Sequence, residues 1–284
     1  MDEAGFELKN ANIAIIGLGL MGGSMAQSLK NNCRHLSALD IDQSTLEIAR
    51  SKEYVHFAGS DPVETLVDAD LVILACPVSA IVDWLNRLPS YIQHPCIVLD
   101  IGSTKRVIVA AMNDLPKNFD PLGGHAICGK EKLSLNNAEC HLFQNAPFLL
   151  SPMTRTSINA RNAALQIIEV IGANPVWVDA ETHDGILAMT SHLPYLLSSA
   201  LALITPEIMS PFIGPGFRSS SRLADTPSSM MLDVLESNRD EILPVLTRFR
   251  DQLICIEKIL LENDTEKLKD LLDLARNQYQ SLVH

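Results

Sequence analysis

A glycine-rich turn near the N-terminus is the first segment whose residue types and spacing could support chemistry. Gly17-Leu18-Gly19-Leu20-Met21-Gly22 follows the apolar run 12–16 and precedes a helical pattern, the context in which a G-x-G-x-x-G match binds a dinucleotide. Its first glycine permits a tight turn, its second lets the backbone approach a pyrophosphate, and its third packs a helix against a strand. The amino end of that helix would face the phosphates. The expected cofactor contacts here are Gly17, Gly19, Leu20, Met21 and Gly22.

An acidic residue follows at the spacing that a dinucleotide site requires. Asp40 ends the next apolar run, 21 residues after Gly19, and a carboxylate there accepts hydrogen bonds from the adenosine ribose and repels a 2′-phosphate. We therefore expect NAD rather than NADP. Asp42 can share the ribose contact, and the alternative interpretation is a plain turn with a helix-capping aspartate. The residues after the run 71–75 complete the expected cofactor site: Cys76 and Pro77.

Two later segments carry residues suited to proton transfer. Asp100-Ile101-Gly102-Ser103-Thr104-Lys105 follows another apolar run, on the side where ligands bind in open α/β sheets. Gly123-Gly124-His125 is expected in a comparable loop. A histidine can accept a proton from a substrate hydroxyl near neutral pH, and a serine hydroxyl nearby can orient both groups. His125 and Ser103 are therefore the candidate catalytic pair, although the same residue types also occur as a surface histidine and a capping serine.

Short apolar runs alternate with helical patterns through the first part of the chain, an order that builds a parallel sheet. Strands are expected at 12–16, 36–39, 71–75, 97–100, 147–150 and 175–178, with a Gly-Gly-His turn after Pro121. Helices are expected at 22–31, 44–51, 79–88 and 157–171. Beyond residue 179 the period becomes helical. The predicted fold is α/β, with an N-terminal Rossmann-type dinucleotide-binding domain at 1–180 and a C-terminal all-helical substrate and dimerisation domain at 181–284.

The helix expected over 187–204 is unusually apolar. So much apolar surface exceeds what a small helical lobe covers, and we therefore expect a second copy of the chain to cover it in a homodimer. Pro194 within this helix cannot donate a hydrogen bond to the Thr190 carbonyl, so it should interrupt the helix beside His192.

The composition excludes several classes of partner. The net charge is −12, and the sequence lacks the Lys and Arg clusters that bind nucleic acid or anionic membranes. The six cysteines are scattered without metal-ligand spacing, so we expect no metal site and no disulfide framework, but small buried hydrophobic residues in a reducing compartment. No apolar run approaches the roughly 20 residues that cross a bilayer, and the N-terminus is acidic and polar. Cytoplasmic localisation is expected.

Several separated motifs together resemble the prephenate and arogenate dehydrogenase family of tyrosine biosynthesis, over essentially the whole chain from residue 12 onward. They occur in the family's order: Gly-Leu-Gly-Leu-Met-Gly-Gly-Ser, Asp-Ile-Gly-Ser-Thr-Lys, Gly-Gly-His125-Ala-Ile-Cys-Gly-Lys-Glu131, His183-Asp184, Ser191-His192-Leu193-Pro194, and Gly216-Phe217-Arg218 with Ser221-Arg222. The resemblance implies oxidative decarboxylation, in which hydride leaves ring C4 for NAD, the C4 hydroxyl loses its proton and the ring carboxylate departs as carbon dioxide. It implies that His125 accepts the proton and that Ser103 hydrogen-bonds the hydroxyl and His125.

The resemblance also implies substrate-binding residues. Arg222 would anchor a carboxylate, because a guanidinium pairs with it bidentately and does not deprotonate. Arg218 either assists or pairs only structurally, His192 would contact the substrate, and Glu131 would form a gate or polar wall. His183 is interpreted only as a polar residue early in a helix. The alternatives are solvated ion pairs for the arginines and a satisfied core residue for His192.

The chain departs from the family pattern at positions expected on the pocket wall. Ala126 stands where many relatives have proline, Tyr195 where a second histidine is often found, and Met231 where tryptophan is common. We expect prephenate to be preferred over arogenate, because an enzyme that selects the ammonium of arogenate needs an acidic partner for it. The positions that follow Pro227 are neutral. Asp225 would reverse this choice if it faces the pocket.

Two other functions compete with this interpretation. A β-hydroxyacid dehydrogenase shares the opening glycine-rich segment, but its catalytic lysine lies in a G-x-x-x-K helical motif that is absent from the second half of this sequence. A non-catalytic NAD-binding sensor would keep the fold without the chemistry. The presence of Ser103, His125 and Arg222 together argues against a sensor.

Overall fold

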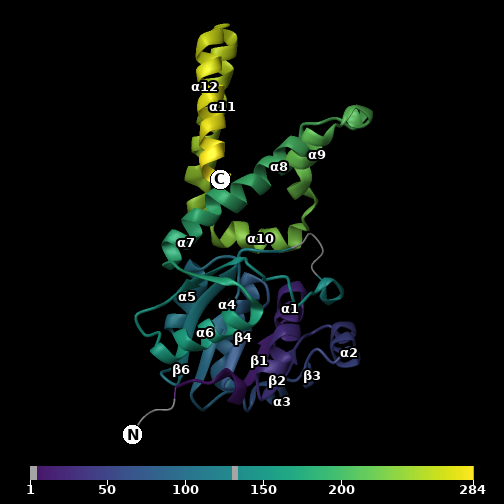
Figure 1. Ribbon diagram of the computed structural model, residues 1–284, viewed down its shortest axis with the longest axis vertical. Coiled ribbons are helices and arrows are strands. Elements are labelled where there is room, and N and C mark those ends of the chain that lie inside the picture. Colours follow the sequence, from purple (N-terminus) through teal and green to yellow (C-terminus); the bar gives the residue numbers. More distant parts are fainter. Residues whose placement is uncertain (1–4, 130–133, 284) are drawn as a thin grey trace. The chain divides into compact units, whose positions relative to one another are not determined.

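An eight-stranded sheet organises the first two thirds of the chain (Figure 1). A computed structural model describes residues 5–129 and 134–283. The strand order is β3-β2-β1-β4-β5-β6-β7-β8, and every neighbouring pair is parallel except β6 with β7. The strands are β1 (Asn12–Ile16), β2 (His35–Leu39), β3 (Phe57–Gly59), β4 (Leu71–Leu74), β5 (Cys96–Asp100), β6 (Phe119–Ala126), β7 (Pro147–Ser151) and β8 (Asn174–Trp177). The predicted α/β fold with a Rossmann-type sheet is confirmed.

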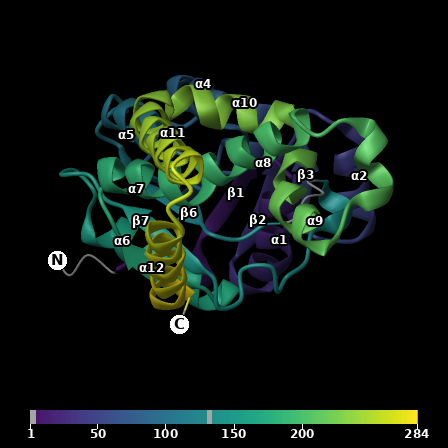
Figure 2. The ribbon, with the colours of Figure 1, turned by 90° about the horizontal axis from the view of Figure 1, so that it is seen from above.

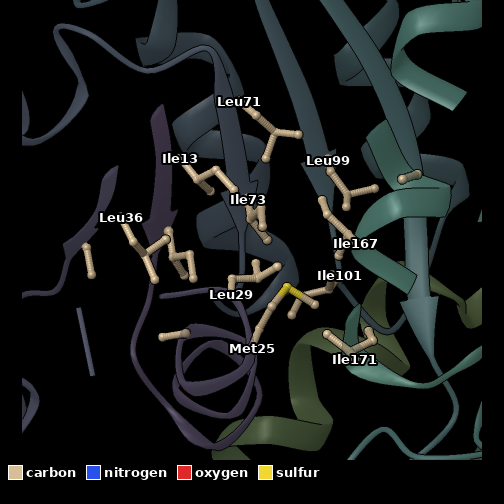
Figure 3. Packing of buried hydrophobic residues seen from close by; sticks show 14 of the residues in the cluster. Ile13, Met25, Leu29, Leu36, Leu71, Ile73, Leu99, Ile101, Ile167 and Ile171 are labelled. Atoms are coloured by element: carbon tan, nitrogen blue, oxygen red, sulfur yellow. The ribbon is translucent and has the colours of Figure 1, made fainter. Parts of the chain in front are cut away.

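The sheet is buried on both faces because its strands are apolar at successive positions. In β1, Ile13 and Ile15 join one hydrophobic cluster, whereas Ala14 and Ile16 join a second. The first cluster includes Met25, Leu29, Ile167 and Ile171 from two covering helices, as Figure 3 shows from close by. The second cluster is closed by residues of two other helices: Ile81, Leu85, Ile108 and Met112.

The helices of this part of the chain lie between the strands. They are α1 (Leu20–Leu29), α2 (Gln43–Ser51), α3 (Pro62–Leu66), α4 (Val78–Arg87), α5 (Arg106–Asn113) and α6 (Ile158–Ile171). Short 3₁₀ turns accompany them at η1 (Leu8–Asn10), η2 (Lys30–Asn32), η3 (Leu88–Ser90) and η4 (Leu135–Asn137). Side-chain oxygens of Asp42, Asp61 and Ser157 accept backbone hydrogen bonds at the starts of α2, α3 and α6, which satisfies N–H groups that a helix leaves unpaired.

The Gly-Gly-His segment is strand and not the predicted turn or loop. Gly123, Gly124 and His125 lie within β6 and pair with β7. The glycines fit because neighbouring groups approach closely: a Cβ on Gly124 would lie 2.7 Å from the carbonyl oxygen of Asp100. Strand β3 and the helices α3 and α5 were also absent from the prediction.

A helical region follows the sheet. It comprises α7 (Ala180–Leu187), η5 (Ala188–His192), α8 (Leu193–Leu203), η6 (Glu207–Phe212), α9 (Pro215–Ser221), η7 (Arg222–Asp225) and α10 (Ser228–Ser237). The interruption expected before Pro194 is present, because η5 is a π-helical turn that separates α7 from α8. Figure 2 shows α10 alongside α4, where Asp233 accepts hydrogen bonds from the backbone N–H and the hydroxyl of Ser79.

The described residues up to Asn238 form one compact unit, and those from Arg239 onward form a second. The second contains α11 (Arg239–Leu261) and α12 (Thr265–Val283), which contact each other. Asn263, between these helices, has a left-handed φ of 53°, a conformation that asparagine tolerates better than most residues.

Two expectations from the composition need correction. Segment Ala180–Leu203 is long and apolar enough to cross a membrane, contrary to the expectation that no such run exists. Its polar residues His183, Asp184 and His192 are buried and hydrogen-bonded within the first unit. Among the cysteines only Cys96 is buried, while Cys140 and Cys255 are exposed.

Candidate active site

The glycine-rich turn has the geometry expected of a dinucleotide cradle. Gly17 has a left-handed φ of 97°, and a Cβ on it would lie 2.5 Å from the carbonyl oxygen of Ala75. A Cβ on Gly22 would lie 1.9 Å from the carbonyl oxygen of Gly17, so α1 approaches the turn as closely as only glycine allows. Gly19 precedes α1 without a side-chain cap. The first N–H groups of α1 are therefore available to a phosphate.

The remaining predicted cofactor residues surround this turn. The side chain of Leu20 is buried and that of Met21 is half-buried, so Leu20 can reach a cofactor only through its backbone. Cys76 lies against Gly17, since a Cβ on Gly17 would be 3.3 Å from the Cβ of Cys76. Burial raises the pKa of Cys76 to about 12, which keeps this thiol protonated. Pro77 immediately precedes α4.

Asp40 and Asp42 make different contacts. Asp40 accepts hydrogen bonds from the backbone N–H of Leu18, at 2.7 Å, and of Asp42, at 2.9 Å. It thereby connects the end of β2 to the glycine-rich turn. Asp42 instead caps α2, and hydrogen bonds from the side chains of Thr45 and Ser44 lower its pKa to about 2. The helix-capping aspartate of the alternative interpretation is therefore Asp42.

A buried ion pair lies at the carboxyl end of β5. Asp100 and Lys105 are fully buried and in contact with each other. Asp100 also accepts hydrogen bonds from the backbone N–H groups of Gly102, at 2.9 Å, and Gly124, at 3.2 Å. Complete burial raises the pKa of Asp100 and lowers the pKa of Lys105, and the contact between them opposes both shifts. The pair joins the loop that carries Ser103 to the strand that carries His125.

The imidazole of His125 is half-buried on β6 and faces a second histidine. Its Nδ1 lies 2.9 Å from Nε2 of His183, and the ring centroids are 5.1 Å apart. Burial, followed by the neighbouring His183, Lys105 and His192, holds the pKa of His125 well below its ordinary value of 6.5. His125 is therefore neutral at physiological pH and able to accept a proton.

His192 belongs to the same cluster. Its Nδ1 lies 3.1 Å from the side-chain nitrogen of Asn238, which also donates to the backbone carbonyl of Asp184 at 2.8 Å. Because a carbonyl only accepts, the Asn238 group that faces both atoms is the N–H₂, so Nδ1 of His192 is the acceptor and its proton is on Nε2. Burial lowers the pKa of His192 to about 4. This histidine is thus a neutral hydrogen-bond donor.

The other predicted site residues do not form hydrogen bonds with this histidine cluster in the part of the chain that the structure describes. Ser103 is half-buried in the loop after β5, but among the described residues its hydroxyl forms no hydrogen bond with His125. Arg218 and Arg222 are exposed in α9 and η7, two elements that pack against α8. Glu131 lies outside the described residues. The structure therefore brings the histidines together and leaves both arginines exposed.

Sequence reasoning gave no role to Asp184 and undervalued His183. Both are fully buried beside His125, and they come from the start of α7. Asp184 accepts hydrogen bonds from the backbone N–H groups of Lys105 and Arg106. The adjacent His-Asp pair in the sequence was the available signal, but its pairing with a strand 58 residues away required the structure.

Comparison with known proteins identifies relatives over most of the chain. A family model for the prephenate dehydrogenase nucleotide-binding domain matches residues 25–177, and one for the prephenate dehydrogenase dimerization domain matches residues 179–274. Prephenate dehydrogenase of Bacillus subtilis is 29% identical over 269 residues, which cover 91% of this chain and 72% of the relative.

Solved structures show the same architecture. Arogenate dehydrogenase of Synechocystis is 26% identical, with a TM-score of 0.82 over 96% of this chain and 100% of that chain. Prephenate dehydrogenase of Aquifex aeolicus, solved in complex with hydroxyphenyl propionate and NAD⁺, is 23% identical, with a TM-score of 0.88 over 98% of this chain and 100% of that one. This second likeness is one of fold.

Proposed function

Because the chain belongs to the prephenate dehydrogenase family, we propose that it oxidises prephenate to 4-hydroxyphenylpyruvate with NAD and releases carbon dioxide. One observation supports this most directly: a half-buried histidine on β6 is kept neutral, and its hydrogen bond with another described residue uses Nδ1, on the opposite side of the ring from Nε2. A neutral imidazole with one nitrogen available is what proton removal from a ring hydroxyl requires. The glycine-rich turn supplies the matching cofactor site.

In this proposal the chain's residues position the reactants and accept one proton. NAD, when bound, accepts the hydride that leaves ring C4. His125 accepts the proton of the C4 hydroxyl, and Ser103, in the loop beside it, orients that hydroxyl. As the C4 carbonyl develops, the ring carboxylate leaves as carbon dioxide and its bonding electrons enter the ring, so the C4 oxygen takes up the negative charge of a phenolate. The imidazolium of His125 then returns its proton to that oxygen, which gives the hydroxyl of 4-hydroxyphenylpyruvate. Aromatisation supplies the driving force, so the protein needs no acid to assist the departure.

We assign substrate recognition to the helical region. Arg222 anchors a carboxylate, with Arg218 one helical turn earlier as a second cation, because a planar guanidinium matches a carboxylate bidentately. His192 donates its Nε2–H to a substrate oxygen, a role consistent with its neutral state. Glu131 remains the proposed gate of the pocket.

We assign cofactor recognition to the turn between β1 and α1 and to Asp40. Gly17, Gly19, Leu20, Met21 and Gly22 hold the pyrophosphate, Asp40 binds the ribose, and Cys76 and Pro77 form the adjoining wall. The proposed domain boundary stays near residue 180, the start of α7. We also propose a cytoplasmic location.

We propose prephenate over arogenate because the first carboxylate in α10 is already hydrogen-bonded within the protein. Asp233 is the first carboxylate after Pro227, and it already accepts hydrogen bonds from the backbone N–H and the hydroxyl of Ser79. NADH formation should therefore show a higher kcat/KM with prephenate when both substrates are offered at equal concentration. A higher kcat/KM with arogenate would mean that an acid such as Asp225 reaches the side-chain ammonium. No NADH with either substrate would favour the sensor or the β-hydroxyacid dehydrogenase.

Asp40 should set the choice between NAD and NADP. In the double variant Asp40→Ser with Ile41→Arg, the repulsion of a 2′-phosphate is removed and a cation is added at position 41, whose side chain is 95% exposed. Preference should shift toward NADP, measured as the ratio of kcat/KM for the two cofactors. Asp42→Asn is the matched control, because an amide also caps a helix. An unchanged ratio in the double variant would falsify the assignment.

The homodimer should form through apolar residues of the helical region. Leu203 is 85% exposed and Phe212 is 86% exposed in the single chain, and side chains of this kind mark association surfaces. The dimerization-domain model that matches residues 179–274 supports the same assignment. Light scattering should give twice the chain's mass of 31.1 kDa. A monomer at micromolar concentration would contradict the dimer.

A further inference from the structure

A chain of hydrogen bonds leads from the amino end of α5 to His125. Asp184 accepts the backbone N–H of Lys105 at 2.7 Å and of Arg106 at 2.9 Å. Its Oδ1 also lies 2.7 Å from Nδ1 of His183. Burial raises the pKa of Asp184, but the hydrogen bonds from His183, Arg106 and Lys105 outweigh burial and lower it overall. Asp184 is therefore an ionised carboxylate, and its Oδ1 accepts a hydrogen bond from His183.

The ionised carboxylate determines where the protons of both histidines lie. A carboxylate only accepts hydrogen bonds, so Nδ1 of His183 carries a proton. In neutral His183 the other nitrogen, Nε2, is then an acceptor. The atom 2.9 Å from it is Nδ1 of His125, which must donate. Neutral His125 consequently has its proton on Nδ1 and a lone pair on Nε2, at the opposite side of the ring.

We propose that Asp184 and His183 are positioning residues that hold His125 in the tautomer able to accept the substrate proton at Nε2. The inference rests on the proposed function, in which His125 is the base. When the proton arrives, His125 becomes an imidazolium with N–H groups on both nitrogens. Its Nδ1–H still donates to His183, whose Nδ1–H still donates to the Asp184 carboxylate. No proton needs to move along the chain.

The charges around His125 explain why this connection is needed. Burial is the main cause that disfavours a positive charge on His125, and the neighbouring His183, Lys105 and His192 disfavour it further. Asp184, reached through His183, supplies a compensating negative charge as the imidazolium forms. A preorganised anion is worth more in such a buried site than in water, because little solvent reorganises during the reaction.

Paired variants of His183 separate positioning from structural support. In His183→Leu, Nδ1 of His125 loses its acceptor, so kcat should fall by roughly tenfold to a hundredfold, part of the 10²–10⁴ that a positioned base contributes, with KM nearly unchanged. The acidic limb of the kcat–pH profile should also move, because His183 is among the groups that set the pKa of His125. In His183→Gln, the side-chain carbonyl can still accept from His125. The kcat of His183→Gln should therefore be much closer to that of the wild type than the kcat of His183→Leu.

Asp184→Asn tests the carboxylate. The amide N–H₂ can donate to Nδ1 of His183, which transfers the His183 proton to Nε2 and reverses the bond to His125. His125 would then accept a hydrogen bond from His183 at Nδ1 and carry its proton on Nε2, so that Nε2 has no lone pair for the substrate proton. We expect kcat to fall at least as far as in His183→Leu. His94→Gln is the control for losing a histidine. His94 contacts the carbonyl of Ala69 next to the amino ends of β4 and β5, whereas the site lies beyond the carboxyl end of β5.

Nitrogen-15 NMR of histidine-labelled protein reads the tautomer directly. The chain has eight histidines, and comparison with His125→Asn assigns the His125 signals. The wild type should show a protonated Nδ1 and an unprotonated Nε2 at neutral pH. A protonated Nε2 in His125 of the wild type, or an unchanged kcat–pH profile in folded His183→Leu, would overturn the positioning role of Asp184 and His183. If His125→Asn itself keeps its turnover, the proposed function fails instead, so the two failures are distinguishable.

Discussion

Replacing His125 with asparagine should lower kcat by roughly a hundredfold or more while KM changes much less. The imidazole is the neutral, hydrogen-bonded group that we assign to proton removal, and an amide cannot accept a proton near neutral pH. Asparagine keeps a donor close to the position of Nδ1, so contact with His183 can persist and the fold should be maintained. Steady-state rates with prephenate and NAD measure the effect, and thermal unfolding checks that the variant is folded. Near-normal turnover in a folded variant would remove His125 from the mechanism.

The pH dependence of the wild type follows from the same environment. Burial, together with the neighbouring His183, Lys105 and His192, lowers the pKa of His125. The base form exists above that pKa, so kcat/KM should stay high as the pH falls through 6.5 and should decline only at lower pH. In His125→Asn this acidic limb should disappear from the remaining activity.

Sequence periodicity was sufficient for most of the sheet because buried parallel strands are continuous apolar runs. The expected strand 12–16 coincides with β1, and the expected 97–100 lies within β5 (Cys96–Asp100). The strand β6 was missed because Phe119–Ala126 contains a proline and two adjacent glycines, which locally favour a turn. Gly124 is required there by the close approach of Asp100 and Phe148. That requirement arises from tertiary packing, which a local pattern does not express.

In the candidate site, too, only the residues with a local sequence signature could be predicted. Residues with a local signature, such as Gly17 and Asp40, could be selected from spacing alone, since the turn and its helix are one continuous segment. His183 was given no chemical role because a polar residue early in a helix is common. Its significance depends on contact with His125, on a strand distant in sequence, and with a carboxylate that the start of α5 holds ionised. Hydrogen bonds between separate elements leave little trace in one sequence.

Replacing Arg222 with alanine should have the opposite kinetic effect to the His125 substitution. We assign Arg222 to a substrate carboxylate, and loss of such an anchor weakens binding before and during the reaction alike. KM should therefore rise strongly while kcat changes less. Truncating one partner of a buried charge pair costs about 2–5 kcal/mol. Because Arg222 is exposed in the free protein, we expect the lower end, about 2 kcal/mol or roughly a thirtyfold rise in KM.

Two further substitutions make the Arg222 result specific. Arg222→Lys keeps the charge but loses the planar fork, so its KM should lie between those of the wild type and Arg222→Ala. Arg276→Ala removes an exposed positive charge from α12, where no substrate contact is assigned, and controls for the general loss of attraction for an anionic substrate. If Arg276→Ala raises KM as much as Arg222→Ala does, the effect is one of net charge and not of a specific carboxylate contact. An unaltered KM in Arg222→Ala would assign the carboxylate to another residue.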